Sequence, residues 1–91
     1  MREEEKIKVL DNIRISLAKN AHDSWSGWMR YLFDNSRKNN GGSVTIPKDF
    51  VSRWERQMNT DFFDLPKDEQ KSDYQEADKI LSLIRLILSN M

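Results

Sequence analysis

The chain has 91 residues and a mass of 10.8 kDa, which suffices for one small domain with a single core. Fifteen lysines and arginines balance fifteen aspartates and glutamates, so the net charge is zero. A protein that coats nucleic acid or a membrane surface would be strongly basic, and we expect neither as a partner. The absence of cysteine excludes disulfides, thiolate catalysis and cysteine-ligated metal sites.

A long first helix is predicted from the spacing of apolar residues. Between residues 7 and 32 they recur every three or four positions, as one face of an α-helix requires. Gly27 is the weakest position, and a break between residues 23 and 27 is compatible with the pattern. The turn-forming run at residues 39–43 ends the segment. The predicted apolar stripe consists of Ile7, Leu10, Ile13, Leu17, Ala21, Trp25, Trp28 and Leu32.

Two shorter elements are predicted in the middle of the chain. Residues 44–46 are Val-Thr-Ile, and we expect an extended stretch but not a sheet, because no other segment alternates between apolar and polar residues. Pro47 fits the first turn of a second helix, where its missing N–H costs nothing. Residues 59–61 end this helix. Its predicted buried face is Phe50, Val51, Trp54 and Met58.

An irregular connector at residues 62–66 leads into the third helix. We expect this Phe-Phe-Asp-Leu-Pro run to lie against the core, because two adjacent exposed phenylalanines promote aggregation. Pro66 followed by Asp68 and Glu69 marks a helix start. The apolar stripe that follows is Tyr74, Ala77, Leu81, Ile84 and Leu88, widened by Ile80, Leu83, Leu86 and Ile87.

The surplus of apolar residues at 80–88 has two interpretations. It favours a homo-oligomer that forms through the last helix, because one stripe is enough for a three-helix monomer. The alternative is that this surface docks against the long first helix of the same chain.

The sequence therefore predicts an all-α single domain over residues 1–91. It has a long first helix, a short middle helix and a long C-terminal helix, joined by an irregular connector. The longest apolar stretch, residues 80–88, contains Arg85 and falls short of the roughly twenty residues that span a bilayer. The first residues are acidic, unlike a secretory signal, so we expect a cytoplasmic protein.

Catalysis is not expected from these residues. His22 is the only histidine, and the neighbouring Asp23 points from a different face of the helix, so the two do not form a dyad. Gly41 and Gly42 lack the following lysine and hydroxyl residue of a phosphate-binding loop. The carboxylates after residue 57 are typical of a solvated face. We predict no enzyme activity and no cofactor.

Basic and aromatic residues gather in one half of the chain. Residues 14–56 hold eight basic and four acidic residues and all three tryptophans. Guanidinium groups beside large rings suit a nucleotide, because the rings stack on a base and the guanidinium donors bind phosphates. The alternative, favoured by their place on the apolar stripes, is that the tryptophans belong to the core. The candidate residues are Trp25, Trp28, Arg30, Arg53 and Arg56.

Two motifs carry a resemblance to a known family. Residues 17–25, Leu-Ala-Lys-Asn-Ala-His-Asp-Ser-Trp, resemble the opening motif of the ryanodine-receptor repeat (RyR) domain, Leu-Ala-Glu-Asn-x-His-x-x-Trp. Residues 63–73 resemble its Tyr-x-x-Leu-x-x-x-x-Lys-x-x-Asp element. Residues 39–58 depart from the repeat and look instead like small stand-alone proteins of bacteriophages and prophages. The likeness spans residues 13–88.

The resemblance implies a helical binding domain without catalytic residues. By motif position it adds Asn20 and His22 to the candidate ligand site, and it points to Lys71 and Asp73 in the second element. It implies a protein that senses or sequesters a nucleotide-derived ligand. In a phage, such a protein would act in the host cytoplasm and keep this signal from a defence effector. The alternative function is a protein-interaction module that oligomerises through its C-terminal helix.

Overall fold

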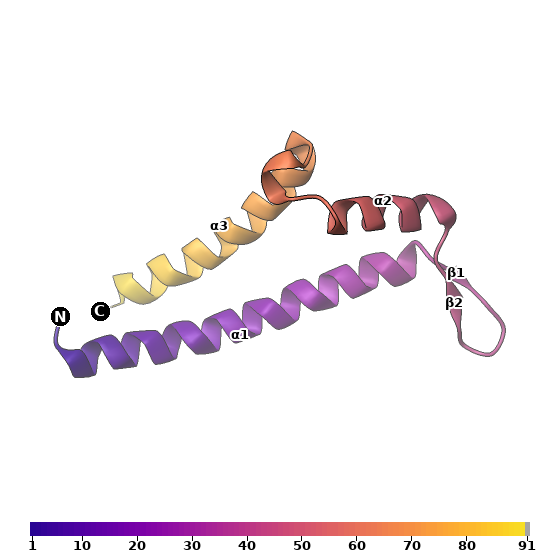
Figure 1. Ribbon diagram of the computed structural model, residues 1–91. Helices are drawn as coiled ribbons and strands as arrows, with labels where there is room; N and C mark the ends of the chain where they lie inside the picture. Colours follow the sequence, from indigo (N-terminus) through magenta and orange to yellow (C-terminus); the bar gives the residue numbers. More distant parts are fainter. Residues whose placement is uncertain (91) are drawn as a thin grey trace.

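The computed structural model describes residues 1–90 and consists of three helices and one short hairpin (Figure 1). The predicted all-α fold with a long first, a short middle and a long C-terminal helix is confirmed. In chain order the elements are α1 (Glu3–Asp34), β1 (Arg37–Lys38), β2 (Val44–Thr45), α2 (Lys48–Met58), the 3-10 turn η1 (Phe62–Asp64) and α3 (Lys67–Ser89).

Helix α1 runs through 32 residues, with no break between residues 23 and 27. A glycine costs about 1 kcal/mol in a helix interior, which is too little for Gly27 to interrupt a helix hydrogen-bonded on both sides. Three glutamates in the first turn complement the positive end of the helix dipole. Asn35 ends the helix, and its side-chain amide donates to the Tyr31 carbonyl at 2.8 Å.

A two-stranded antiparallel hairpin follows α1, and the prediction that residues 44–46 form no sheet was wrong. β1 pairs with β2, with Lys38 opposite Val44. The turn closes the hairpin locally, because Gly41 and Gly42 adopt φ values of 86° and 92° that favour glycine. The Asn39 side chain donates across the turn to Thr45 Oγ1 at 2.9 Å. The glycines of the turn and the Asn39 hydrogen bond therefore stabilise the pairing of β1 with β2, although the strands do not alternate apolar and polar residues.

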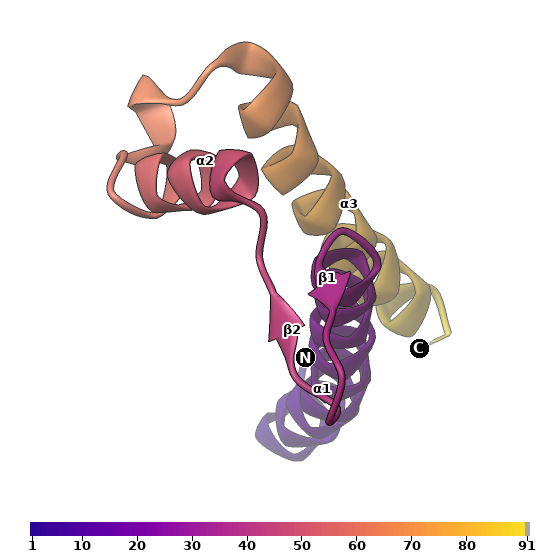
Figure 2. The same ribbon diagram turned by 90° about the vertical axis from the view of Figure 1, so that its right-hand side faces the viewer.

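The three helices form an open V and not a closed bundle. α3 returns antiparallel to α1, so that both ends of the chain lie at the same end of the molecule (Figure 1). Viewed along α1, α2 and α3 lie on two flanks of this helix and leave the rest of it uncovered (Figure 2). The dimensions are 56 × 36 × 17 Å, and the radius of gyration is 18.2 Å. A compact chain of this length would have a radius of gyration near 12 Å, about two-thirds of that value.

Each pair of helices is joined by one small set of contacts. Tyr31 on α1 has its ring centroid 6.2 Å from the rings of both Phe50 and Trp54 on α2. Arg56 on α2 binds Glu69 on α3 through two hydrogen bonds of 2.7 and 3.2 Å. The α1–α3 pair has a 2.7 Å hydrogen bond from the Ser24 hydroxyl to Glu76, and Val9 and Ile87 line one groove near the chain ends.

The connector between α2 and α3 is held by a buried amide. Gln70 is 5% exposed, and its side-chain amide donates to the carbonyls of Phe63 and Leu65 at 3.3 and 3.0 Å. Phe62 packs edge-on against Tyr74, with ring centroids 5.4 Å apart. The prediction that both phenylalanines lie against the core was wrong, because Phe63 is 85% exposed. The Gln70 hydrogen bonds fix the Phe63 backbone and leave its ring in solvent.

The apolar core is sparse. Among residues 1–90, Val9 is the only buried apolar side chain, at 8% exposed. The predicted stripes are largely uncovered: Leu10 is 63% and Trp25 60% exposed, and Met58 at the end of α2 is 76% exposed. The α1 residues that face α3, such as Val9 and Ser24, each come one position before a residue of the predicted stripe. The exposed members of the stripe, such as Leu10 and Trp25, therefore turn away from α3, whereas Ile13 and Leu17 are half-buried.

Replacing Gln70 tests how far the connector depends on its amide. Gln70→Leu would leave two carbonyls without their donor, so we expect the free energy of unfolding to fall by about 1–3 kcal/mol. Urea unfolding at matched protein concentration measures this. Gln75→Leu, at an exposed position of the same helix, is the control and should change the free energy by less than about 0.5 kcal/mol. If both variants lose the same free energy of unfolding, the Gln70 amide does not hold the connector.

Candidate functional site

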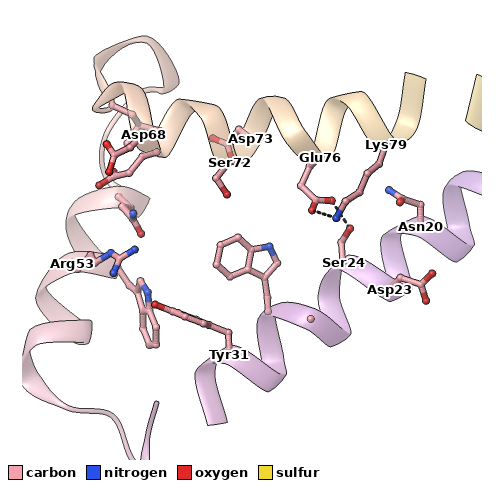
Figure 3. A pocket seen from close by; sticks show the side chains of 16 residues that line it. Asn20, Asp23, Ser24, Tyr31, Arg53, Asp68, Ser72, Asp73, Glu76 and Lys79 are labelled. Atoms are coloured by element: carbon pink, nitrogen blue, oxygen red, sulfur yellow. Dashed lines mark hydrogen bonds and ion pairs between the residues drawn. The ribbon is translucent and has the colours of Figure 1, made fainter. Parts of the chain in front are cut away.

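A cleft of about 860 Å³ lies where the three helices meet (Figure 3). It is closed at one end by the Tyr31–Trp54 contact, on another side by the Arg56–Glu69 pair, and along α1 and α3 by the Ser24–Glu76 hydrogen bond. The lining residues are Asn20, Asp23, Ser24, Gly27, Trp28, Tyr31, Arg53, Trp54, Gln57, Leu65, Asp68, Glu69, Ser72, Asp73, Glu76 and Lys79.

Aromatic rings form the apolar part of the cleft. Trp28 meets Tyr31 edge-on, with ring centroids 6.1 Å apart, and Tyr31 lies 6.2 Å from Trp54. Trp54 in turn lies 5.3 Å from Phe50. These rings are three and four residues apart on their helices, which places them on the sides of α1 and α2 that meet. They hold α2 against α1 and at the same time expose aromatic surface to the cleft.

The polar part of the cleft is mainly acidic, with five carboxylates and two cationic side chains among its lining residues. Three of the carboxylates already have partners. Hydrogen bonds from Arg56 lower the pKa of Glu69. The Lys79 ammonium, 2.8 Å away, and the Ser24 hydroxyl lower the pKa of Glu76. The Lys19 ammonium, also at 2.8 Å, lowers the pKa of Asp23.

Three charged side chains of the cleft make no ion pair or side-chain hydrogen bond within residues 1–90: Arg53, Asp68 and Asp73. Arg53 extends from α2, and the two aspartates extend from the facing part of α3 (Figure 3). A nucleotide phosphate would meet one unengaged guanidinium and two unengaged carboxylates. Like charges in one site repel, so this arrangement is unfavourable for an anionic ligand.

The structure brings three of the seven predicted site residues together. Asn20, Trp28 and Arg53 line the cleft. Arg56 lies beside it and is engaged by Glu69. The other three predicted residues do not line the cleft, and all three are exposed: His22, Trp25 and Arg30.

The residues outside the cleft lie on other sides of α1. Trp25 is 60% exposed, and its ring centroid is 6.1 Å from that of His22. His22 Nε2 lies 3.4 Å from the Ser26 hydroxyl, one turn along the helix. Of the positions that the RyR resemblance adds in the second element, Asp73 lines the cleft and Lys71 does not. The resemblance therefore marks residues that the fold places in different surroundings.

Sequence reasoning missed several residues that shape the cleft. Ser24 and Glu76 are separated by 52 positions, and no local pattern indicates their hydrogen bond. Tyr31 and Trp54 were detectable, because each lies at helical spacing from another large ring. The contact between these two rings depends on the angle at which the hairpin sets α2 against α1, and local sequence patterns do not predict this angle.

No group of three or more histidine, aspartate and glutamate side chains within residues 1–90 is arranged to hold a metal ion. Across the same residues, neither α1 nor α3 has a stretch that is long and apolar enough to span a bilayer.

Comparisons with protein-family models, with curated proteins and with solved structures found no match to this chain. The likeness to the RyR family gains no support from them and stays a prediction. The function must therefore be argued from the chain's own surfaces.

The ion pair beside the cleft predicts an acid-sensitive contribution to stability. Because Arg56 lowers the pKa of Glu69 in the folded chain, the pair stabilises fully above the ordinary carboxyl pKa of about 4.3 and is lost as the pH falls through the lowered value. We expect Glu69→Gln to lose less stability than the wild type between about pH 6 and pH 3. Urea unfolding at each pH measures this, with Glu55→Gln on the exposed side of α2 as the control for removal of one negative charge.

The charge of the cleft also predicts the response to nucleotides. ATP, ADP-ribose, NAD and cyclic mono- and dinucleotides should leave the melting temperature unchanged, because the cleft opposes their phosphates. A nucleotide at 100 times its dissociation constant would instead stabilise the fold by about 2.7 kcal/mol. A thermal-shift screen measures this. A shift that disappears in Arg53→Ala would contradict the interpretation and establish a nucleotide site.

Proposed function

We propose that this chain is a non-enzymatic protein-interaction module whose apolar surface is covered by a protein partner. The observation that carries the proposal is the exposed area of the chain. It exposes 7673 Å², whereas a compact monomer of 10.8 kDa would expose about 5,500 Å². The excess of about 2,100 Å² falls in the range that each subunit of an obligate dimer buries, about 1,000–2,500 Å².

The chemistry of the excess surface supports a protein partner. Its contributors include Leu10 and Trp25 on α1 and Leu81 on α3, which are between 45% and 63% exposed. Soluble monomers seldom expose contiguous apolar patches of more than a few hundred Å², and larger ones mark interaction sites. Because these side chains are exposed, the isolated chain buries little apolar surface to offset the conformational entropy that it loses on folding.

The cleft supports the nucleotide hypothesis less well. Its shape and its rings would accept a base, but its unengaged charges include more carboxylates than guanidinium groups. Binding of a nucleotide-derived ligand thus stays a prediction of the sequence, and the interaction module is the function that the geometry favours.

Dilution of the purified chain tests the proposal. If a partner, of whatever identity, normally covers the apolar surface, the uncovered chain should bind the dye ANS strongly and lose cooperative unfolding. Fluorescence titration and urea unfolding over a hundredfold range of protein concentration measure both properties. A dilute monomer that unfolds cooperatively and binds no dye would contradict the proposal, because such a chain needs no cover.

A further inference from the structure

Four exposed apolar residues of α1 and α3, Leu10, Trp25, Leu81 and Leu88, follow one rule. On α1, Val9 faces α3, and Leu10, the next residue, is exposed; Ser24 contacts Glu76, and Trp25, the next residue, is exposed. On α3, Ile80 and Ile87 are half-buried, whereas Leu81 and Leu88 are exposed. In both helices, each residue of this exposed apolar row therefore comes one position after a residue that faces the other helix.

This offset places both exposed rows on the same side of the helix pair. One residue is a rotation of about 100° about the helix axis. α1 and α3 are antiparallel and face each other, so equal rotations about their opposed axes turn both rows toward the same side (Figure 1). We call this side the open face; it consists of Ile7, Leu10, Ala21, Trp25, Tyr74, Ala77, Leu81 and Leu88.

The open face has the spacing of a helix-packing surface. Together with the half-buried Ile84, its α3 row recurs at intervals of three, four, three and four residues from Tyr74 to Leu88, which is the seven-residue repeat of a coiled coil. Its two rows are adjacent along the molecule, because Ser24 meets Glu76 near the middle and Val9 and Ile87 share a groove near the chain ends. A pair of helices is therefore the shape that best covers it.

We propose that the open face is covered by a second copy of this chain, giving a two-fold four-helix bundle of α1, α3 and their counterparts. This inference rests on the proposed function and names its partner. The chain has zero net charge, so no long-range repulsion opposes self-association. The excess exposed area matches what one subunit of an obligate homodimer buries, as a second copy would require.

The molar mass in solution, measured by sedimentation equilibrium, tests this proposal. At micromolar concentration the wild type should have twice the mass of one chain, 10.8 kDa. Leu10→Asp and Leu81→Asp place a charge in the open face twice per dimer, and we expect each to raise the dissociation constant about a hundredfold or more. Leu10 is 63% and Leu81 45% exposed in the single chain, so each substitution acts mainly on the open face.

The opposite side of the helix pair provides matched controls. Ile15 and Leu86 each precede an inward-facing residue by one position, and they are 70% and 60% exposed. Ile15→Asp and Leu86→Asp should leave the dimer intact. If these controls dissociate as the test variants do, or if the test variants remain dimeric, the open face is not the interface.

A monomeric wild type would overturn the second-copy proposal. If that monomer binds ANS and unfolds without cooperativity, the interaction module stands and its partner is a different protein. If it binds no dye and unfolds cooperatively, the proposed function fails as well. The two proposals can therefore fail separately.

Discussion

Helix α1 presents apolar side chains along most of its 32 residues, and α2 and α3 cover only part of this surface. Helices α2 and α3 meet α1 along two flanks, and Val9 is the only apolar side chain that becomes buried among residues 1–90. Local contacts, such as the Tyr31–Trp54 rings and the Arg56–Glu69 pair, set the angles between helices. They add little apolar burial, so the open V leaves much of the apolar surface of the helices exposed.

The cleft and the open face are two different consequences of the same arrangement. The cleft arises because α2 holds α3 away from one half of α1. Its carboxylates are mostly engaged in pairs that fix the helices, as Glu69 and Glu76 show. The open face has no such internal role in the single chain, and its residues are apolar and recur at helix-packing intervals. Binding to protein is therefore better supported than binding to a small anionic ligand.

The sequence predicted the helices because periodicity and turn residues are local signals. The three-four spacing of apolar residues located α1 and α3, and Pro47 and Pro66 lie immediately before the helices whose starts they marked. Which side of each helix is buried could not be predicted in the same way. Leu10 and Val9 are adjacent and equally apolar, and only the rotation of α1 against α3 decides that Val9 is covered. The Ser24–Glu76 hydrogen bond that helps set this rotation links residues 52 positions apart.

The central claim is that folding of this chain is coupled to covering its apolar surface by a second copy. The dependence of the urea unfolding midpoint on protein concentration tests it most directly. For a dimer that unfolds to separate chains, each tenfold increase in concentration should stabilise the folded state by about 1.4 kcal/mol per mole of dimer. A midpoint that rises in this way agrees with the account. A cooperative transition with the same midpoint at every concentration would contradict it.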